Sequence, residues 1–480
     1  MVIKNIYSME TNFLKVSSCI NFGNNIDKNN KPSDNKGVLV GVAGAGVAVT
    51  GLAIWACSKK APTTNNVTST LEHLKPQPSD VLYIQSLAQD MTRVLGEKIS
   101  PENLKSVMGK NELLSILPKM KAENYSPKGN LENGVFKIDL HSHSNYSDGQ
   151  GDVAQLLNQA AEYGNKLQSK TGENFIFALS DHDGIDGVKE ALKLIAKNPE
   201  KYQNVRFVPA VEISFAHTVD NTSNKCEGSE VLAHCINPFS DKTIAFFDKL
   251  HQKRESMISN CLNELSSAIP ETKFSPAEMQ RYYLKKPTEN FAYNLHWRIL
   301  NYSQIKRRVS LMAIEQNKNP EKFYKDLMHD FHYGKNDKSP YNFNKFLLEK
   351  NMQTNAPMED EQVKNICQKY FPALDESGRV KAAGENSFED IIENFSEDKG
   401  ICLGFAHPYF FATRFKNPEI AIKSHIEKSK GLLKTTESHH QSYPEFTKKQ
   451  EIEKTNKIIE DFGLIPFGGQ DNHSKNIINC

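Results

Sequence analysis

The sequence of 480 residues predicts an α/β fold of parallel strands closed or covered by helices, with a helical insertion and an N-terminal transmembrane segment. From Val135 onward, short apolar runs alternate with amphipathic helical patterns, as in chains that build parallel sheets. The alternation breaks between about 266 and 398, and an uncharged run occupies residues 37–57. The length suits two or three domains.

Composition limits the classes of function. Hydrophobic residues make up 38% and charged residues 24%, which allows a sizeable core, and the net charge is +1. A balanced charge gives no electrostatic reason to expect a protein that coats nucleic acid, although a small phosphorylated substrate fits if bound cations supply positive charge locally. The eight cysteines form no Cys-x-x-Cys pair, so a thiolate zinc site is not expected. Free core thiols are expected rather than disulfides, which favours a reducing compartment for the catalytic part.

The N-terminal region divides into four predicted parts. Residues 1–36 are polar and are expected to be disordered, and residues 37–57 are long enough for a single membrane anchor. Alternatives for that run are a buried Gly/Ala helix, a flexible stretch, or a lipoprotein signal ending in a cysteine. Residues 58–80 are predicted to be a linker and residues 81–130 a helical collar.

The membrane orientation stays open, because equal numbers of lysines flank the uncharged run. A cytoplasmic catalytic part is favoured. Gly37 and Gly41 have the spacing that lets membrane helices pack closely, so self-association of the anchor is also expected.

The catalytic part is expected at 131–265 and 399–480, with 266–398 as the helical insertion between them. Strands are predicted at 135–140, 175–179, 205–213, 231–236, 401–405, 432–436 and 464–467. Asp152 is placed to cap the helix that follows it. Further helices are predicted at 188–196, 241–265, 416–428 and 445–461.

Side chains that bind metals follow almost every predicted strand. The candidates are His141, His143, Asp148, Asp181, His182, Glu212, His234, His407, Asp471 and His473. Imidazoles and carboxylates are the usual ligands of Zn, Mn and Fe. Because working groups in α/β barrels lie at the carboxyl ends of the strands, we expect these side chains to converge on one site.

Four of these segments resemble the signature blocks of the PHP (polymerase and histidinol phosphatase) superfamily. The blocks are Ile138–His143, Tyr146–Gly149, Leu179–Gly184 and Gly469–His473. The Ser-Asp-Gly at 147–149 is closest to the branch of nucleotide phosphatases and 5′–3′ exoribonucleases. The resemblance covers about 135–262 and 400–473.

The resemblance implies a distorted (βα)7 TIM-like barrel that holds two or three divalent metal ions, Mn, Zn or Fe. One metal would take His141, His143, Glu212 and Asp471. A second would share Glu212 and add His234 and His407. A third would take Asp148, His182 and His473, with Asp181 beside them. Metal-activated water would then hydrolyse phosphate esters of nucleotides, oligonucleotides or small metabolites.

Two residues are candidates for substrate contacts. His440, or its neighbour His439, follows the predicted strand 432–436 and could touch phosphate or protonate a leaving group, or else lie in an exposed loop. Arg254 could bind phosphate or lie on a solvated helix face. The expected partner is a small phosphorylated substrate or a short nucleic acid. Alternative functions are a histidinol-phosphate phosphatase and a non-catalytic, membrane-tethered interaction platform.

Overall fold

The structure is a computed structural model. It describes residues 79–117, 131–132, 135–218, 226–282, 295–333, 343–352, 359–371, 386–396, 401–407, 418–439, 457 and 460–476. All of them belong to one compact unit, Val67–Cys480.

The expectation of a membrane-anchored protein is corrected by the structure. Within the described ranges, every helix is too short or too polar to cross a bilayer. Residues 37–57, on which the expectation depended, lie outside the described residues. The predicted transmembrane segment and membrane localisation find no support in the part of the chain that the structure describes.

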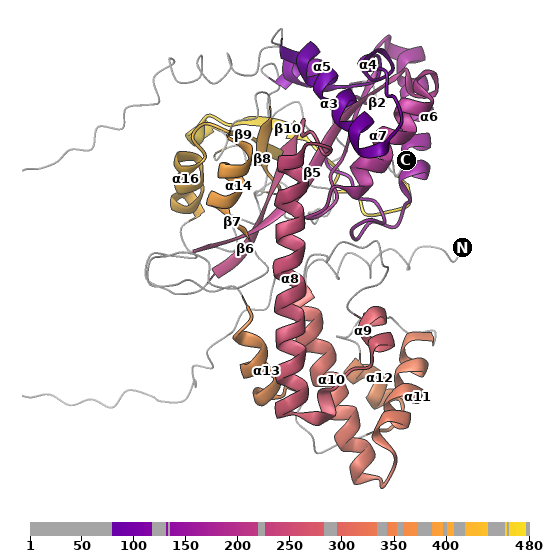
Figure 1. The fold of residues 1–480 in the computed structure, drawn as a ribbon, viewed down its shortest axis with the longest axis vertical. Coiled ribbons are helices and arrows are strands. Elements are labelled where there is room, and N and C mark those ends of the chain that lie inside the picture. The colour runs from indigo at the N-terminus through magenta and orange to yellow at the C-terminus, as the bar shows by residue number, and fades with distance from the viewer. Residues whose placement is uncertain are drawn as a thin grey trace, which may run out of the picture. The chain divides into compact units, whose positions relative to one another are not determined.

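An eight-stranded sheet forms a nearly closed barrel (Figure 1). Its main path runs in the order β10-β9-β8-β6-β5-β4-β3, and the short β7 (Asn386–Ser387) pairs with β5. The path strands are β3 (Ile138–Asp139), β4 (Phe175–Leu179), β5 (Val205–Thr218), β6 (Cys226–His234), β8 (Cys402–Phe405), β9 (Leu433–His439) and β10 (Ile465–Gly468). The prediction of an α/β barrel is confirmed in this general form.

Backbone contacts bring the first and last strands of the barrel together. Leu140 N donates to Gly468 O at 3.1 Å, and Ser142 and Asn472 form a parallel bridge just beyond. A separate two-stranded ribbon, β1 (Leu131–Glu132) with β2 (Val135–Phe136), precedes β3.

One strand of the barrel path runs against the others. The pairs β3–β4, β4–β5, β8–β9 and β9–β10 are parallel, whereas β6 is antiparallel to both β5 and β8. The reversal follows from local connection, because β5 and β6 are consecutive strands paired as a long hairpin. The carboxyl end of β6 therefore lies at the opposite rim of the barrel from the carboxyl ends of its neighbours.

Helices cover the outer face of the sheet. They are α3 (Ser79–Leu95), α4 (Pro101–Lys105), α6 (Val153–Thr171), α7 (Asp186–Lys197), α8 (Asp241–Ala268), α14 (Phe388–Phe395) and α16 (Pro418–Lys428), whereas α5 (Lys110–Ile116) packs against the interior residues of the barrel. The predicted cap of α6 is confirmed, since the Asp152 carboxylate accepts from Gln155 N at 2.8 Å. Gly172 ends this helix with a φ of 73°, a conformation that glycine adopts without strain.

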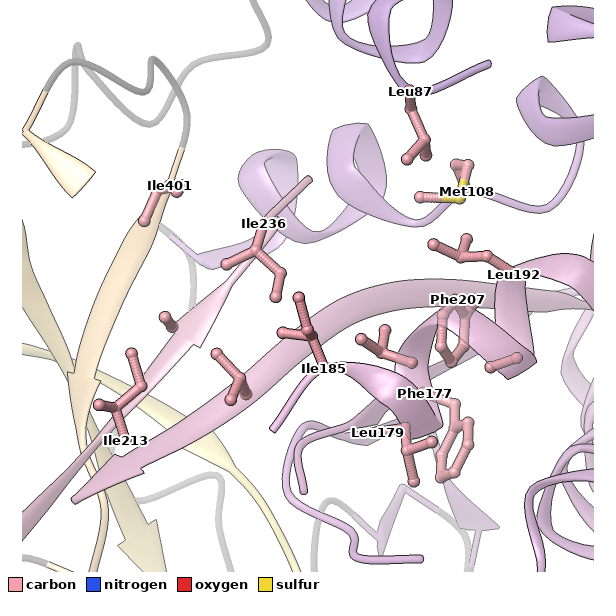
Figure 2. Packing of buried hydrophobic residues seen from close by; sticks show 14 of the residues in the cluster. Leu87, Met108, Phe177, Leu179, Ile185, Leu192, Phe207, Ile213, Ile236 and Ile401 are labelled. Carbon is pink, nitrogen blue, oxygen red and sulfur yellow. The ribbon is translucent and has the colours of Figure 1, made fainter. Parts of the chain in front are cut away.

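The alternating side chains of β5 show how the core is divided. Phe207 and Ile213 point outward into a cluster shared with the helices, which includes Leu87 of α3 and Met108 from the connection between α4 and α5 (Figure 2). Val208 belongs to the cluster inside the barrel. Period-two alternation in a strand requires this division, and it directs Glu212 to the interior face as well.

The barrel interior is apolar below the polar strand ends. Leu140, Ala178, Leu232 and Phe467 are buried there together with Leu113 of α5. Helix α5 is thus packed into the barrel core.

The predicted insertion contains a second hydrophobic core. Its helices are α9 (Pro276–Tyr282), α10 (Leu295–Glu315), α11 (Pro320–Tyr333), α12 (Phe343–Glu349) and α13 (Glu361–Gln368). Helix α8 contributes Phe247 and Leu250 to the cluster between the sheet and its covering helices, and Cys261 and Leu265 to this second core. One uninterrupted helix therefore belongs to both packing units (Figure 1).

Candidate metal centre

Eight of the predicted metal-binding side chains lie in segments that follow parallel barrel strands, and a ninth, Glu212, lies within β5 beyond the last residue paired with β4. Eight of these nine form two groups whose ligand atoms lie within 4.8 Å of one another. The groups are His141, Glu212, His407 and Asp471, and His143, Asp148, His182 and His473. They come from segments up to 332 residues apart in sequence, between His141 and His473. The fold, rather than chain proximity, assembles them.

Glu212 is the centre of the first group. Its Oε2 lies 2.9 Å from His141 Nε2, 3.3 Å from His143 Nε2 and 3.2 Å from His182 Nδ1. Its Oε1 lies 3.1 Å from His407 Nε2. One fully buried carboxylate thus faces four imidazoles, an arrangement suited to bridging two cations.

Asp148 is the corresponding carboxylate of the second group. Its Oδ1 lies 3.1 Å from His473 Nε2 and 3.8 Å from His143 Nδ1, and its Oδ2 lies 3.7 Å from His182 Nε2. Asp471 joins the two groups, because its Oδ1 lies 3.1 Å from His143 Nε2 and 3.3 Å from His141 Nε2. The two groups therefore form one continuous centre.

Electrostatic coupling across the centre is strong. Burial by itself would lower the pKa of the His141 imidazole, but Glu212 and Glu437 raise that pKa well above its ordinary value. Against the same effect of burial, Glu212 raises the pKa of His407 to about 9, and Asp148 raises the pKa of His473 to about 10. The carboxylates thus favour a positive charge on each side of the centre.

The donor atoms also have the arrangement that a cation requires. Among the described residues, Glu212 Oε1 and His473 Nε2 make no hydrogen bond, although each is 3.1 Å from an atom of opposite polarity. Ligands held about 2.1 Å from one metal ion approach each other to roughly 3 Å without bonding to one another. The residues therefore fit divalent metal ions by type, burial and spacing.

The backbone is strained at two of these positions. His407 has a φ of 34° and Asp471 a φ of 47°, in the left-handed region that residues with a side chain rarely adopt. Such strain costs about 1–3 kcal/mol and tends to occur at functional sites. Here it accompanies two side chains that reach the centre from the ends of β8 and β10.

The structure does not bring His234 to this centre. His234 ends β6, the reversed strand, and pairs with Ala210, which precedes Glu212 by two residues on β5. Its Nε2 lies 3.0 Å from Leu140 O, and burial lowers its pKa to about 4. His234 is a neutral side chain of the barrel interior, packed edge-on against Phe467.

Glu230, which the sequence analysis did not select, lies at the centre in its place. It pairs with Ser214, two residues beyond Glu212, and is 4% exposed. With Glu212 and His182 it forms a third group of potential ligand atoms within 4.8 Å of one another. The sequence contains one indication of this position: Glu230 precedes His234 by four residues, and an even separation puts both side chains on the same face of a strand.

Asp181 lies behind the ligands and not among them. It accepts hydrogen bonds from Ser144 N at 2.6 Å, Ser144 Oγ at 2.8 Å and Ser147 Oγ at 3.0 Å. A Cβ at Gly187 would collide with its carboxylate. Asp181 therefore holds the loop that carries Asp148.

Glu437 of β9 is a second buried carboxylate behind the ligands. Its Oε1 lies 2.8 Å from His141 Nδ1, and its Oε2 accepts from His407 N at 2.6 Å. A Cβ at Gly469 would come within 2.5 Å of Oε1, so glycine is needed for this contact. Glu437 orients the His141 ring and leaves Nε2 directed at the centre, as carboxylates often do for metal-bound histidines.

Of the two candidate substrate contacts, the structure describes Arg254 but not His440. Arg254 of α8 is buried, and its Nη2 lies 2.9 Å from Asp183 Oδ2. Its guanidinium thus faces a carboxylate of the protein. His440 lies outside the described residues and stays a prediction.

Comparisons with known proteins give distant structural likenesses. No family model matches the chain, and the curated proteins contain no significant match. A proposed metal-dependent phosphoesterase from Bifidobacterium adolescentis has a TM-score of 0.38 and 12% identity, over 71% of this chain and 88% of that one. An amidohydrolase from Chromobacterium violaceum, with bound sulfate and no metal, has a TM-score of 0.36 and 16% identity, over 72% and 90%. Both scores are below 0.5, so neither likeness decides the function.

Proposed function

We propose that the chain is a metal-dependent phosphoesterase with a barrel of the PHP type. The observation that carries the proposal is Glu212, a fully buried carboxylate within 3.3 Å of four imidazole nitrogens. A purely structural ion pair needs one partner, whereas this arrangement supplies shared ligands for more than one cation. The preference for phosphate esters over other substrates is supported by the four sequence blocks that resemble the PHP superfamily.

The substrate class we propose is a nucleotide, an oligonucleotide or another small phosphate ester. Bound divalent cations would activate water for attack on phosphorus and neutralise the charge that develops on the phosphoryl oxygens. Glu212 would hold two of these cations at a fixed separation. His141, His143, His182 and His407 would complete the surroundings of these cations with neutral imidazole donors.

The remaining residues keep the ligands in place. Glu437 fixes the ring of His141, and Asp181 fixes the loop that carries Asp148. These contacts leave the ligand atoms little freedom, so less entropy is lost when cations and substrate bind. His440 remains the proposed group for contacting phosphate or protonating the leaving group.

A hydrolysis panel tests the proposal. The purified full chain is stripped of metal, reloaded with Mn²⁺ or Zn²⁺, and assayed on p-nitrophenyl phosphate, bis-p-nitrophenyl phosphate, nucleotides and short oligonucleotides. We expect metal-dependent release of product from at least one phosphate ester, and loss of that activity in Glu212→Gln. A protein that binds metal but hydrolyses none of these esters would refute the proposed function.

The matched control is Glu278→Gln. Glu278 also carries a carboxylate in a close ion pair, 2.6 Å from Lys306 Nζ, but within the helical insertion. This variant loses one negative charge by the same substitution. Its hydrolysis rate should stay close to that of the wild type.

A further inference from the structure

We propose that Glu230 is a ligand of a further divalent-cation site, completed by Glu212 and His182, and that this site selects Mn²⁺ over Zn²⁺. The inference rests on the metal centre of the proposed function and names the class of cation that one part of it takes. It does not depend on which substrate is hydrolysed.

The reversal of β6 places Glu230 at the correct rim of the barrel. Along β5, Glu212 pairs with Leu232 and Ser214 with Glu230. Glu230 thus lies about 7 Å beyond the level of Leu232, towards the carboxyl ends of the parallel strands. Because Leu232 faces the barrel interior, alternation directs Glu230 inward too.

Glu230 is a buried carboxylate with an unused oxygen. Its side chain is 4% exposed, and Oε1 has no hydrogen-bond partner among the described residues. Its Oε2 lies 3.6 Å from His407 Nδ1, which is longer than a hydrogen bond. A buried acceptor without a partner costs about 1–3 kcal/mol, and more when it is charged. A cation held between Glu230, Glu212 and His182 would remove that cost.

The donor set of this site differs from that of the group around Asp148. Two carboxylates and one imidazole surround it, whereas the group around Asp148 has three imidazoles and one carboxylate. Carboxylate oxygens suit Mn²⁺ and similar hard cations, and imidazole-rich sets suit Zn²⁺. The set implied by resemblance, with His234 beside His407, would be richer in nitrogen. The set of Glu212, Glu230 and His182 has one imidazole and two carboxylates, which favours Mn²⁺.

A simpler role for Glu230 makes a different prediction. If it only compensated the charge of His407, its removal would weaken the group around His407 for every metal alike. If Glu230 is instead a ligand of a separate site, its removal weakens the binding of Mn²⁺ more than that of Zn²⁺. The number of bound ions and their identity therefore separate the two roles.

The experiment counts metal ions in the full-length protein. Metal-free wild type, Glu230→Gln and the Glu278→Gln control are titrated separately with Mn²⁺ and Zn²⁺, and bound metal is measured by elemental analysis and calorimetry. We expect Glu230→Gln to lose one equivalent of Mn²⁺, or to bind it at least 10-fold more weakly, with a smaller change for Zn²⁺. The control should match the wild type for both metals.

Further variants keep the proposal testable. Glu230→His should shift the metal preference towards Zn²⁺ by at least 10-fold. If Glu230→Gln does not fold, Glu230→Asp retains the charge with a shorter reach, and we expect it to weaken Mn²⁺ binding selectively. Unchanged Mn²⁺ binding in the folded variants, or equal weakening of both metals, would overturn the proposal. A chain that binds metals but hydrolyses no phosphate ester would refute the proposed function alone.

Discussion

Replacing Arg254 with glutamine is expected to destabilise the barrel and leave substrate binding intact. Arg254 Nη2 lies 2.9 Å from Asp183 Oδ2, and the two side chains are 4% and 0% exposed. Solvent does not screen such a pair, so the small stabilisation free energies that are typical of surface ion pairs do not apply to it. The variant would leave the Asp183 carboxylate buried beside Ser214 N, at a cost of about 3–5 kcal/mol in the free energy of unfolding.

A double-mutant cycle isolates the pair. Arg254→Gln, Asp183→Asn and the double variant are unfolded with urea and followed by circular dichroism. We avoid tryptophan fluorescence because Trp297 lies in α10 of the insertion and Trp55 lies outside the described residues. The double variant should be less destabilised than the sum of the single variants by about 2 kcal/mol, within the range for contacting residues.

The alternative is the phosphate contact considered from the sequence. In that case Arg254→Gln would unfold at the urea concentration of the wild type, and its KM for a phosphate ester would rise. Wild-type stability combined with a raised KM would refute the ion-pair account.

Three further predictions concern the centre and its surroundings. Glu437→Gln should weaken metal binding about 10- to 100-fold in a titration, because the His141 ring loses its carboxylate partner; unchanged affinity would contradict this role. Glu212→Gln should lose bound metal together with turnover, and wild-type metal content would refute the bridging role. The pKa of His234 is about 4 in the folded protein, below its value of about 6.5 in the unfolded chain. The contribution of the neutral imidazole to the free energy of unfolding is therefore fully present above pH ~6.5 and is lost as the pH falls to about 4. Wild type should lose up to about 3 kcal/mol more than His234→Gln in urea titrations across this range, and equal losses would contradict the assignment.

The strand ends could be predicted from sequence because they depend on local patterns. Apolar runs precede His141, Asp181, Glu212 and Asp471 in the sequence, and parallel strands bring their carboxyl ends to one rim. Hydrophobic alternation along β5 also predicts that Glu212 faces inward. These features need no knowledge of distant partners.

The direction of β6 could not be predicted in the same way. An apolar strand has the same pattern in either direction, and only pairing with β5 and β8 establishes that β6 is antiparallel. The assumption of a parallel strand selected His234 at its carboxyl end. The observed direction brings Glu230 to the candidate metal centre and leaves His234 in the apolar interior.

Side chains behind the ligands also depend on tertiary contacts. Glu437 touches His141 across 296 positions of sequence, and no local spacing predicts such a contact. Arg254 was a candidate for binding phosphate because its helix follows the predicted strand that ends near His234. Its partner, Asp183, belongs to a sequence block in which His182 and Asp181 already had assigned roles.

Metal content and hydrolysis of one sample test the central claim most directly. The purified full chain is loaded with Mn²⁺, freed of excess metal and analysed for bound metal, and the same sample is assayed on the panel of phosphate esters. We predict two to three equivalents of metal per chain and hydrolysis that disappears on chelation and returns with Mn²⁺. A chain with no bound metal, and no activity after addition of Mn²⁺ or Zn²⁺, would contradict the assignment of a metal-dependent phosphoesterase.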